Sequence, residues 1–306
     1  MREEKKMVAR VILNPYSARW KAGERWPEVA PLLRDAGVEY DVVQSTKKGE
    51  GVALAEAAVR AGCSPIIVAG GDGTIGDVIN GMMRAVDDDT PLPPLGILPL
   101  GTANDLFDNL KMSRNIREAC AVIAAGNTRM MDICSVNGRY FANNAALGLE
   151  PMVTVLQERI TWLRGVPRYL YAALQAIFLG TSWQAEIKWD DGEYVGPISL
   201  VSVGNGARTG GLFYMTPHAD LFDGKMTFMF GYVRSRLRML SLLPLTMKSG
   251  EGNVVSKDGF FEIDTASLQI KLSQASPAHA DGELFSQELY EADYRIHPAR
   301  LPLLSK

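Results

Sequence analysis

The sequence predicts two domains: an α/β domain with a parallel sheet, followed by an antiparallel β domain. In residues 8–125, short apolar strands alternate with helices that carry one apolar face, which is the pattern of an α/β layer. From residue 128 onward, strands with period-two alternation and hairpin turns such as Asn137-Gly138 predominate. The chain of 306 residues, 47% of them hydrophobic, is long enough to fill two cores. We place the α/β domain at 1–128 and the antiparallel domain at 129–289.

Short strands and helices are expected to alternate through the first domain. The strands are expected at 8–13, 38–43, 66–69 and 95–98. Ile66 to Ala69 is uncharged and rich in β-branched residues, which is typical of a parallel strand covered on both faces. The helix after it repeats apolar residues at i, i+3, i+4, i+7 and i+8 from Ile75 to Met83, so one stripe can lie on the sheet. The other helices are expected near 26–33, at 52–59, from 106 onward and at 116–125.

The segment Gly70-Gly71-Asp72-Gly73 joins the third strand to its helix and is the most informative part of the sequence. Its three glycines permit positive φ and leave no Cβ in the way, so several backbone N–H groups can converge on one ligand. The segment also lies at a helix N-terminus, where unpaired N–H groups and the helix dipole favour an anion such as phosphate. The alternative is a tight turn without a ligand, with Asp72 or Thr74 as the N-cap.

Three further loops that follow predicted strands contain Asn14, Thr46, and Gly101 to Asn104. Parallel strands release their loops at one edge of a sheet, where ligands collect. Because two of the four loops have the strand-glycine-helix form, we expect a nucleotide site there. Gly71 to Gly76 also fits the dinucleotide fingerprint, but no acidic residue ends the next strand, and the Walker pattern is absent.

The composition argues against several other classes of protein. A net charge of −3 gives no basic surplus for a phosphate backbone, so no nucleic-acid partner is expected. Three cysteines without a C-x-x-C pair indicate neither a disulfide framework nor a zinc site, and favour a reducing compartment. The charged residues 1–6 do not resemble a signal peptide, and the most apolar helical stretch, Tyr169 to Leu179, is too short to cross a bilayer.

The second domain is expected to contain strands separated by unusually apolar helical insertions. The strands are expected at 129–136, 140–147, 184–189, 194–203, 226–230, 260–263 and 268–272. The helical insertions are expected near 152–163, 167–179 and 237–247.

Two acidic motifs in the second domain could carry chemistry. Asp281 and Glu283 stand at i and i+2 on an extended segment, so they face the same way. A carboxylate there could deprotonate an alcohol during phosphoryl transfer, although Asp-Gly is also an ordinary turn. The loop from Pro217 to Lys225 could bind a hard cation through carboxylate and carbonyl oxygens, or could be only a hairpin turn.

Taken together and in order, five motifs resemble the diacylglycerol kinase catalytic family, with the closest likeness to its bacterial soluble lipid kinases, the YegS-like branch. They are Gly70-Gly71-Asp72-Gly73-Thr74, Gly101-Thr102-Ala103-Asn104-Asp105, Asn205 with Gly210-Gly211, Asp223-Gly224, and Asp281-Gly282-Glu283. The resemblance implies an N-terminal domain like those of NAD kinases and 6-phosphofructokinases, a C-terminal β-sandwich, and an active site in the cleft between them. It also implies that the segment 290–306 returns to the first domain.

The resemblance further implies a kinase that uses ATP and Mg²⁺ to phosphorylate a hydroxyl of diacylglycerol or a related lipid. Such an enzyme is expected in the cytoplasm and transiently at the inner face of the membrane; a homodimer is left open. Glu283 is implied as the base. ATP is expected to contact Asn14, Thr46, Gly70, Gly71, Asp72, Gly73, Thr74, Ile75, Gly76, Gly101, Thr102 and Asn104. A structural Mg²⁺ is expected on the Asp223 carboxylate and the backbone oxygens of Asp220 and Lys225.

The sequence departs from the family's pattern at Ala18, which stands where the family's first loop, Asn-Pro-x-Ser-Gly, has its glycine.

Several alternatives for the function and for one helix remain open. The rival functions are an NAD kinase-like small-molecule kinase, against which the Gly-Thr-Ala-Asn-Asp and Asp-Gly-Glu motifs argue, and a nucleotide- or lipid-binding protein without catalysis. The helix from Tyr169 to Leu179, preceded by Arg159, Arg164 and Arg168, is expected either to contact lipid or to be buried over the sandwich. The acceptor lipid is not predicted.

Overall fold

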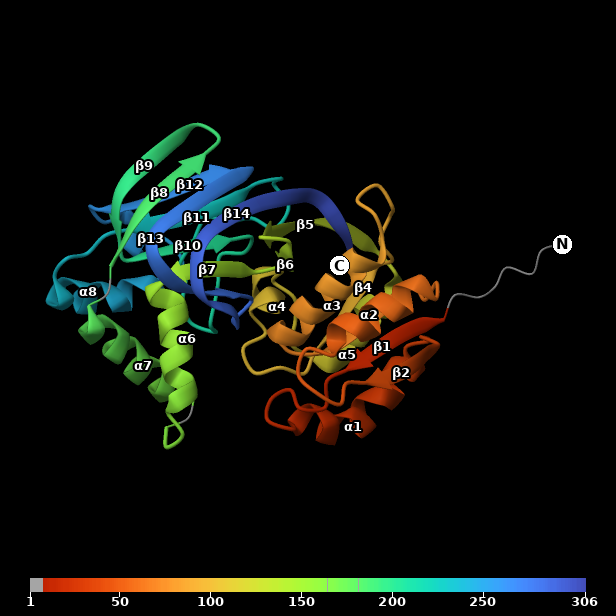
Figure 1. Ribbon diagram of the computed structural model, residues 1–306. Coiled ribbons are helices and arrows are strands. Elements are labelled where there is room, and N and C mark those ends of the chain that lie inside the picture. The colour runs from red at the N-terminus through yellow and green to blue at the C-terminus, as the bar shows by residue number, and fades with distance from the viewer. Residues whose placement is uncertain (1–7, 164, 181) are drawn as a thin grey trace. The chain divides into compact units, whose positions relative to one another are not determined.

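The computed structural model describes residues 8–163, 165–180 and 182–306 (Figure 1). The chain divides into two units, one formed by Met1–Ile133 with Pro298–Lys306 and the other by Cys134–His297. Each unit has its own buried core. Arg164, one of the arginines expected before the lipid-contact helix, lies outside the described residues.

The first unit contains a parallel sheet with the strand order β14-β4-β3-β1-β2. The strands are β1 (Ala9–Leu13), β2 (Tyr40–Gln44), β3 (Ile66–Gly70), β4 (Leu95–Pro99) and the end of β14 (Glu283–Leu304). Every residue of β3 and β4 is buried, as expected for central strands covered on both faces. Their register sets Gly70 beside Pro99, so the loops that follow leave the sheet side by side. The predicted parallel α/β sheet is confirmed.

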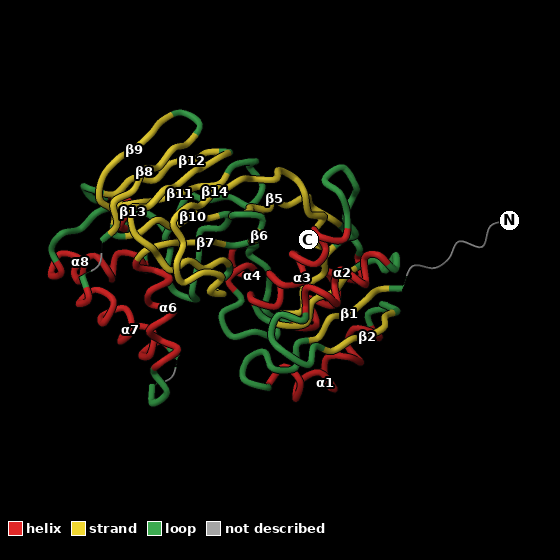
Figure 2. Tube along the Cα trace, in the orientation of Figure 1, coloured by secondary structure: helices red, strands yellow, loops and turns green. Residues whose placement is uncertain are grey.

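The helices of the first unit alternate with these strands (Figure 2). They are α1 (Lys21–Asp35), α2 (Gly51–Arg60), α3 (Asp72–Ala85), α4 (Asp105–Asn109) and α5 (Ile116–Ala125). Helix α3 buries the stripe that its spacing predicts, from Ile75 through Val78 and Ile79 to Met83. It packs against α2 at Gly81, where a Cβ would overlap the backbone oxygen of Val52.

The second unit is built on antiparallel strands in the order β12-β11-β10-β7-β13-β14, with the β8-β9 hairpin joined to β13. The additional strands are β6 (Arg139–Phe141), β7 (Asn144–Gly148), β8 (Trp183–Trp189), β9 (Gly192–Ile198), β10 (Leu200–Gly204), β11 (Met226–Gly231), β12 (Phe260–Thr265) and β13 (Ser267–Ala280). Strand β5 (Thr128–Val136) begins in the first unit and ends in the second. The predicted change from parallel to antiparallel pairing is therefore confirmed.

Two predicted strands are interrupted in the structure. The segment 140–147 is divided into β6 and β7, because the amides of Ala142 and Asn143 donate to the Asp281 carboxylate instead of a neighbouring strand. The segment 194–203 is divided into β9 and β10, because β9 pairs with β8 whereas β10 pairs with β7 and β11. The chain thus changes its pairing partners at Ser199.

The helices of the second unit form a layer of their own. They are α6 (Leu149–Arg159), α7 (Val166–Leu179) and α8 (Arg236–Leu242), followed by 3₁₀ helices at Leu243–Met247 and Val254–Ser256. Helix α7 packs against α6 and α8 and buries Ala172, Ala173, Ala176 and Ile177. Among the described residues, no helix combines the length and the apolar composition required to cross a membrane.

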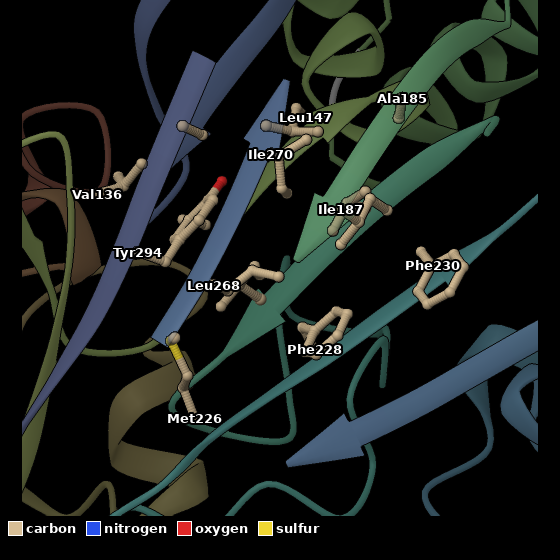
Figure 3. Packing of buried hydrophobic residues seen from close by; sticks show 14 of the residues in the cluster. Val136, Leu147, Ala185, Ile187, Met226, Phe228, Phe230, Leu268, Ile270 and Tyr294 are labelled. Atoms are coloured by element: carbon tan, nitrogen blue, oxygen red, sulfur yellow. The ribbon is translucent and has the colours of Figure 1, made fainter. Parts of the chain in front are cut away.

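Tyr294 is a polar side chain in an apolar core. Figure 3 shows its ring among the buried hydrophobic residues of the second unit, including Leu268 and Phe228. The ring meets Phe141 edge to face, with 6.3 Å between the ring centroids. Within the described part of the chain the Tyr294 hydroxyl has no hydrogen-bond partner, and such a buried hydroxyl destabilises the folded state.

Tyr294→Phe is expected to leave the free energy of unfolding unchanged or to raise it by about 1 kcal/mol, because it removes only the unpartnered hydroxyl. Denaturant unfolding followed by tryptophan fluorescence measures the change, and Trp183 and Trp189 report on the same unit. Tyr290→Phe, at an exposed position on β14, is the control and should change nothing. A clear loss of stability in Tyr294→Phe, with none in Tyr290→Phe, would contradict the conclusion that the Tyr294 hydroxyl makes no stabilising hydrogen bond.

Candidate functional site

The two glycine loops of the first unit touch each other backbone to backbone. A Cβ on Gly71 would lie 2.9 Å from the Cα of Gly101, and a Cβ on Gly101 would overlap the Cα of Gly71. The amide of Leu100 donates to the carbonyl of Gly70 at 3.0 Å, which extends the pairing of β3 and β4 into the loops. Any side chain at position 71 or 101 would therefore push the two loops apart.

Thr74 connects the two glycine loops to the loop that follows β1, which contains Asn14 and Ser17. Asn14 Nδ2 donates to Thr74 Oγ1 at 2.9 Å, and Ser17 Oγ lies 3.2 Å from the same oxygen. Gly70 leaves room for this side chain, because a Cβ there would lie 2.7 Å from Thr74 Oγ1. The structure thus brings together Asn14, Thr74 and the two glycine loops at the carboxyl ends of β1, β3 and β4.

Thr46, the predicted residue after β2, is linked to the same edge through Tyr16. The Tyr16 hydroxyl donates to the Thr46 carbonyl at 3.0 Å. The Thr46 amide and hydroxyl donate to the Glu50 carboxylate, the hydroxyl at 2.9 Å, and these hydrogen bonds lower the pKa of Glu50. Thr46 itself is exposed, so its position allows contact with a ligand in solution.

Helix α3 begins without a side-chain N-cap. The N-cap position is Gly71, so Asp72 and Thr74, the N-cap candidates of the alternative, lie in the first turn of the helix. Asp72 turns instead to the neighbouring loop, where its Oδ1 accepts a hydrogen bond from the Leu106 amide at 3.2 Å. Burial raises the pKa of Asp72, and the amide donors around it partly offset this effect.

The remaining predicted nucleotide contacts have different environments. Asn104, with φ of 50°, folds the second loop by exchanging two hydrogen bonds with Gly101 (3.1 and 3.2 Å). Thr102 is exposed on that loop. Ile75 and Gly76 are buried inside α3, so the Ile75 side chain belongs to the core. Gly73 lies in the first turn of α3 and is half-buried.

In the second unit, Asp281 and Glu283 have different surroundings although they are two residues apart. Asp281 and Gly282 form the turn between β13 and β14, with φ of 47° and 76°. The Asp281 carboxylate accepts the amides of Ala142 and Asn143, both at 2.9 Å, so it organises the backbone. Glu283 is the first residue of β14 and is half-exposed.

The predicted cation loop is an exposed turn before β11. The amide of Phe222 donates to Asp220 Oδ1 at 3.1 Å, and that of Lys225 donates to Asp223 Oδ1 at 2.9 Å. Among the described residues there is no group of three or more His, Cys, Asp or Glu side chains that could hold a metal ion. An ion at this loop would therefore rely on the exposed Asp223 carboxylate and on carbonyl oxygens, a donor set that suits Mg²⁺.

An apolar cavity lies within the second unit, between the helical layer and strands β10 and β11. Its wall includes Val153, Tyr169, Phe213, Met229 and Leu242, and polar side chains reach it only at a few points. The most polar of these, Glu150, was not singled out by the sequence, because a lone acidic residue after an apolar strand is typical of an ordinary first helical turn.

Comparison with known proteins covers both units. The model of the diacylglycerol kinase catalytic domain matches residues 8–136, and that of the YegS C-terminal NAD kinase beta sandwich-like domain matches residues 143–305. A crystal structure of a diacylglycerol kinase from Bacillus anthracis has the same fold, with a TM-score of 0.77 and 21% identity over 98% of this chain and 97% of that one.

Curated relatives are similar over nearly the full length. "Probable lipid kinase YegS" from Escherichia coli is 30% identical, covering 90% of this chain and 89% of that protein. "Diacylglycerol kinase" from Staphylococcus carnosus is 27% identical, covering 91% and 89%. With both family models matched in order and relatives of this similarity, the chain belongs to the diacylglycerol kinase catalytic family of lipid kinases.

Proposed function

We propose that the protein transfers the γ-phosphoryl group of ATP to a hydroxyl of diacylglycerol or a related lipid. The observation that carries the lipid acceptor is the cavity of the second unit, whose wall is mostly apolar. An alkyl chain gains about 0.8 kcal/mol per buried CH₂ in such a cavity. A dinucleotide acceptor, the substrate of the NAD kinase alternative, would find few polar partners there.

The nucleotide belongs, in this proposal, to the carboxyl edge of the first unit's sheet. The uncapped start of α3 favours phosphate, and the touching backbones of Gly71 and Gly101 leave no side chain to obstruct it. Thr74, anchored by Asn14, and the exposed Thr46 and Thr102 would provide hydroxyl contacts. Bound Mg²⁺ would neutralise charge on the phosphates during transfer.

Glu283 is proposed as the base that deprotonates the acceptor hydroxyl. It is half-exposed, and the Asp281 carboxylate accepts hydrogen bonds from the amides of Ala142 and Asn143. Asp281 would therefore act as a positioning residue, because its turn sets where β14 and Glu283 begin. This scheme requires the acceptor hydroxyl to lie beside both Glu283 and the γ-phosphate.

Gly71→Ala is expected to weaken ATP binding about tenfold or more, because the added Cβ meets the backbone of Gly101 and separates the two loops. Calorimetric titration with ATP and Mg²⁺ measures the affinity. Gly250→Ala is the matched control, because no atom of the described residues lies within 4 Å of a Cβ added at Gly250. Equal affinities in all three proteins would argue against a nucleotide site at these loops.

Glu283→Gln is expected to lower kcat by at least about a hundredfold while ATP affinity is kept, because the amide cannot accept the proton. Labelled ATP is incubated with diacylglycerol in mixed micelles and, separately, with NAD. Glu288→Gln, at an exposed position on the same strand, serves as the control. Full turnover in Glu283→Gln would rule out Glu283 as the base. Labelled product from NAD and none from diacylglycerol would favour the small-molecule kinase.

We also propose that α7 contacts the membrane surface that holds the acceptor. Tyr171, Leu174, Phe178 and Leu179 are exposed on this helix although its opposite face is buried, so it is apolar on both sides. The two helices that α7 contacts carry exposed arginines, namely Arg159 on α6 and Arg236 and Arg238 on α8. An exposed apolar helix face on a unit with exposed cations suits an anionic lipid surface.

The double substitution Phe178→Glu and Leu179→Glu is expected to reduce binding to vesicles at least tenfold, because two apolar anchors become anions. Co-sedimentation with vesicles of phosphatidylglycerol and phosphatidylcholine measures the bound fraction. Val195→Glu, an exposed apolar position on β9 of the same unit, is the control. If the double variant and the control both bind as the unmodified protein does, α7 is not the contact.

A further inference from the structure

Glu150 is a buried carboxylate in the wall of the apolar cavity. It lies in the first turn of α6, and its side chain is only 8% exposed. The cavity wall around it is formed largely by apolar side chains, among them Leu149, Val153 and Phe213. A carboxylate in such surroundings needs hydrogen-bond donors for both of its oxygens.

Among the described residues, hydrogen-bond donors reach only one of the two carboxylate oxygens. Asn144 Nδ2 donates to Glu150 Oε1 at 3.0 Å, and His279 Nε2 lies 3.2 Å from the same atom. The Thr209 hydroxyl donates to Asn144 Oδ1 at 2.8 Å, which turns the amide nitrogen of Asn144 toward Glu150. Within the described residues Glu150 Oε2 has no hydrogen-bond partner.

The charge of Glu150 acts on the wall of the cavity itself. Tyr169 lines the cavity and packs on Phe213, with 4.8 Å between the ring centroids. Burial raises the pKa of Tyr169, and the nearby Glu150 carboxylate raises it further. An anionic ligand group would meet the same repulsion, whereas a hydroxyl or ammonium group would give Oε2 the donor it lacks.

We propose that Glu150 Oε2 accepts a hydrogen bond from the polar group of the amphiphile whose alkyl chain enters this cavity. Glu150 is then a specificity residue that selects hydroxyl-bearing lipids and excludes fatty acids and other anionic amphiphiles. The inference rests on the proposed lipid acceptor for its biological meaning. Its binding test needs neither ATP nor turnover.

The test compares three probes with the same ten-carbon acyl chain: monodecanoylglycerol, methyl decanoate and decanoate. Dissociation constants below the critical micelle concentration are measured calorimetrically at neutral pH. The unmodified protein is expected to bind the glycerol ester at least about tenfold more tightly than the methyl ester, which has no donor, and decanoate most weakly.

Glu150→Gln keeps the shape and an oxygen for Asn144 while removing the charge, so discrimination between the glycerol ester and decanoate should fall about tenfold or more. The affinity for methyl decanoate should stay constant. Glu186→Gln, at an exposed position on β8, is the control and should keep the selectivity. Circular dichroism confirms that the variants are folded.

Equal affinity of the unmodified protein for the three probes, or no binding of any of them, would overturn the inference even if Glu150→Gln failed to fold. An unchanged selectivity in folded Glu150→Gln would overturn it as well. If the selectivity behaves as expected but no lipid is phosphorylated, the proposed kinase substrate fails and the role of Glu150 stands.

Discussion

The contact between the backbones of Gly71 and Gly101 is the constraint on which the first unit's site depends. Adjacent parallel strands are only about 4.8 Å apart, so the loops leaving β3 and β4 at Gly70 and Pro99 must share the same small space. Without side chains they touch, and α3 can begin directly at the contact. The hydroxyl of Thr74 then faces the first loop instead of being displaced by it.

The local part of this arrangement could be predicted from sequence, and the long-range part could not. A strand, three glycines and an apolar stripe predict the turn at Gly71 and the buried face of α3. The hydrogen bond from Asn14 to Thr74 joins residues sixty positions apart, and no local pattern specifies it. Ala18 is intermediate: the sequence marks it as a departure from glycine, and its φ of 52° shows why glycine would fit more easily.

The second unit shows how spacing alone can mislead. Asp281 and Glu283 look equivalent at i and i+2, but the left-handed turn at Asp281 commits that carboxylate to the amides of Ala142 and Asn143. The same hydrogen bonds divide a predicted continuous strand. Glu150 was missed for a related reason, since its cavity is assembled from α6, α7 and strands that are distant in the sequence.

Asp281 and Glu150 show two different roles of a carboxylate in the second unit, one in stabilising the backbone and one, by our proposal, in binding a ligand. The Asp281 carboxylate accepts hydrogen bonds from the amides of Ala142 and Asn143, so its charge stabilises the backbone between β6 and β7 in the free protein. Glu150 is held by Asn144 through Oε1, while its buried Oε2 lacks a partner among the described residues, and the residue forms part of an apolar wall. Such an arrangement lowers the stability of the free protein unless a donor arrives. A lipid hydroxyl would convert this loss into binding energy, because it adds the missing hydrogen bond as its chain displaces water from the same cavity.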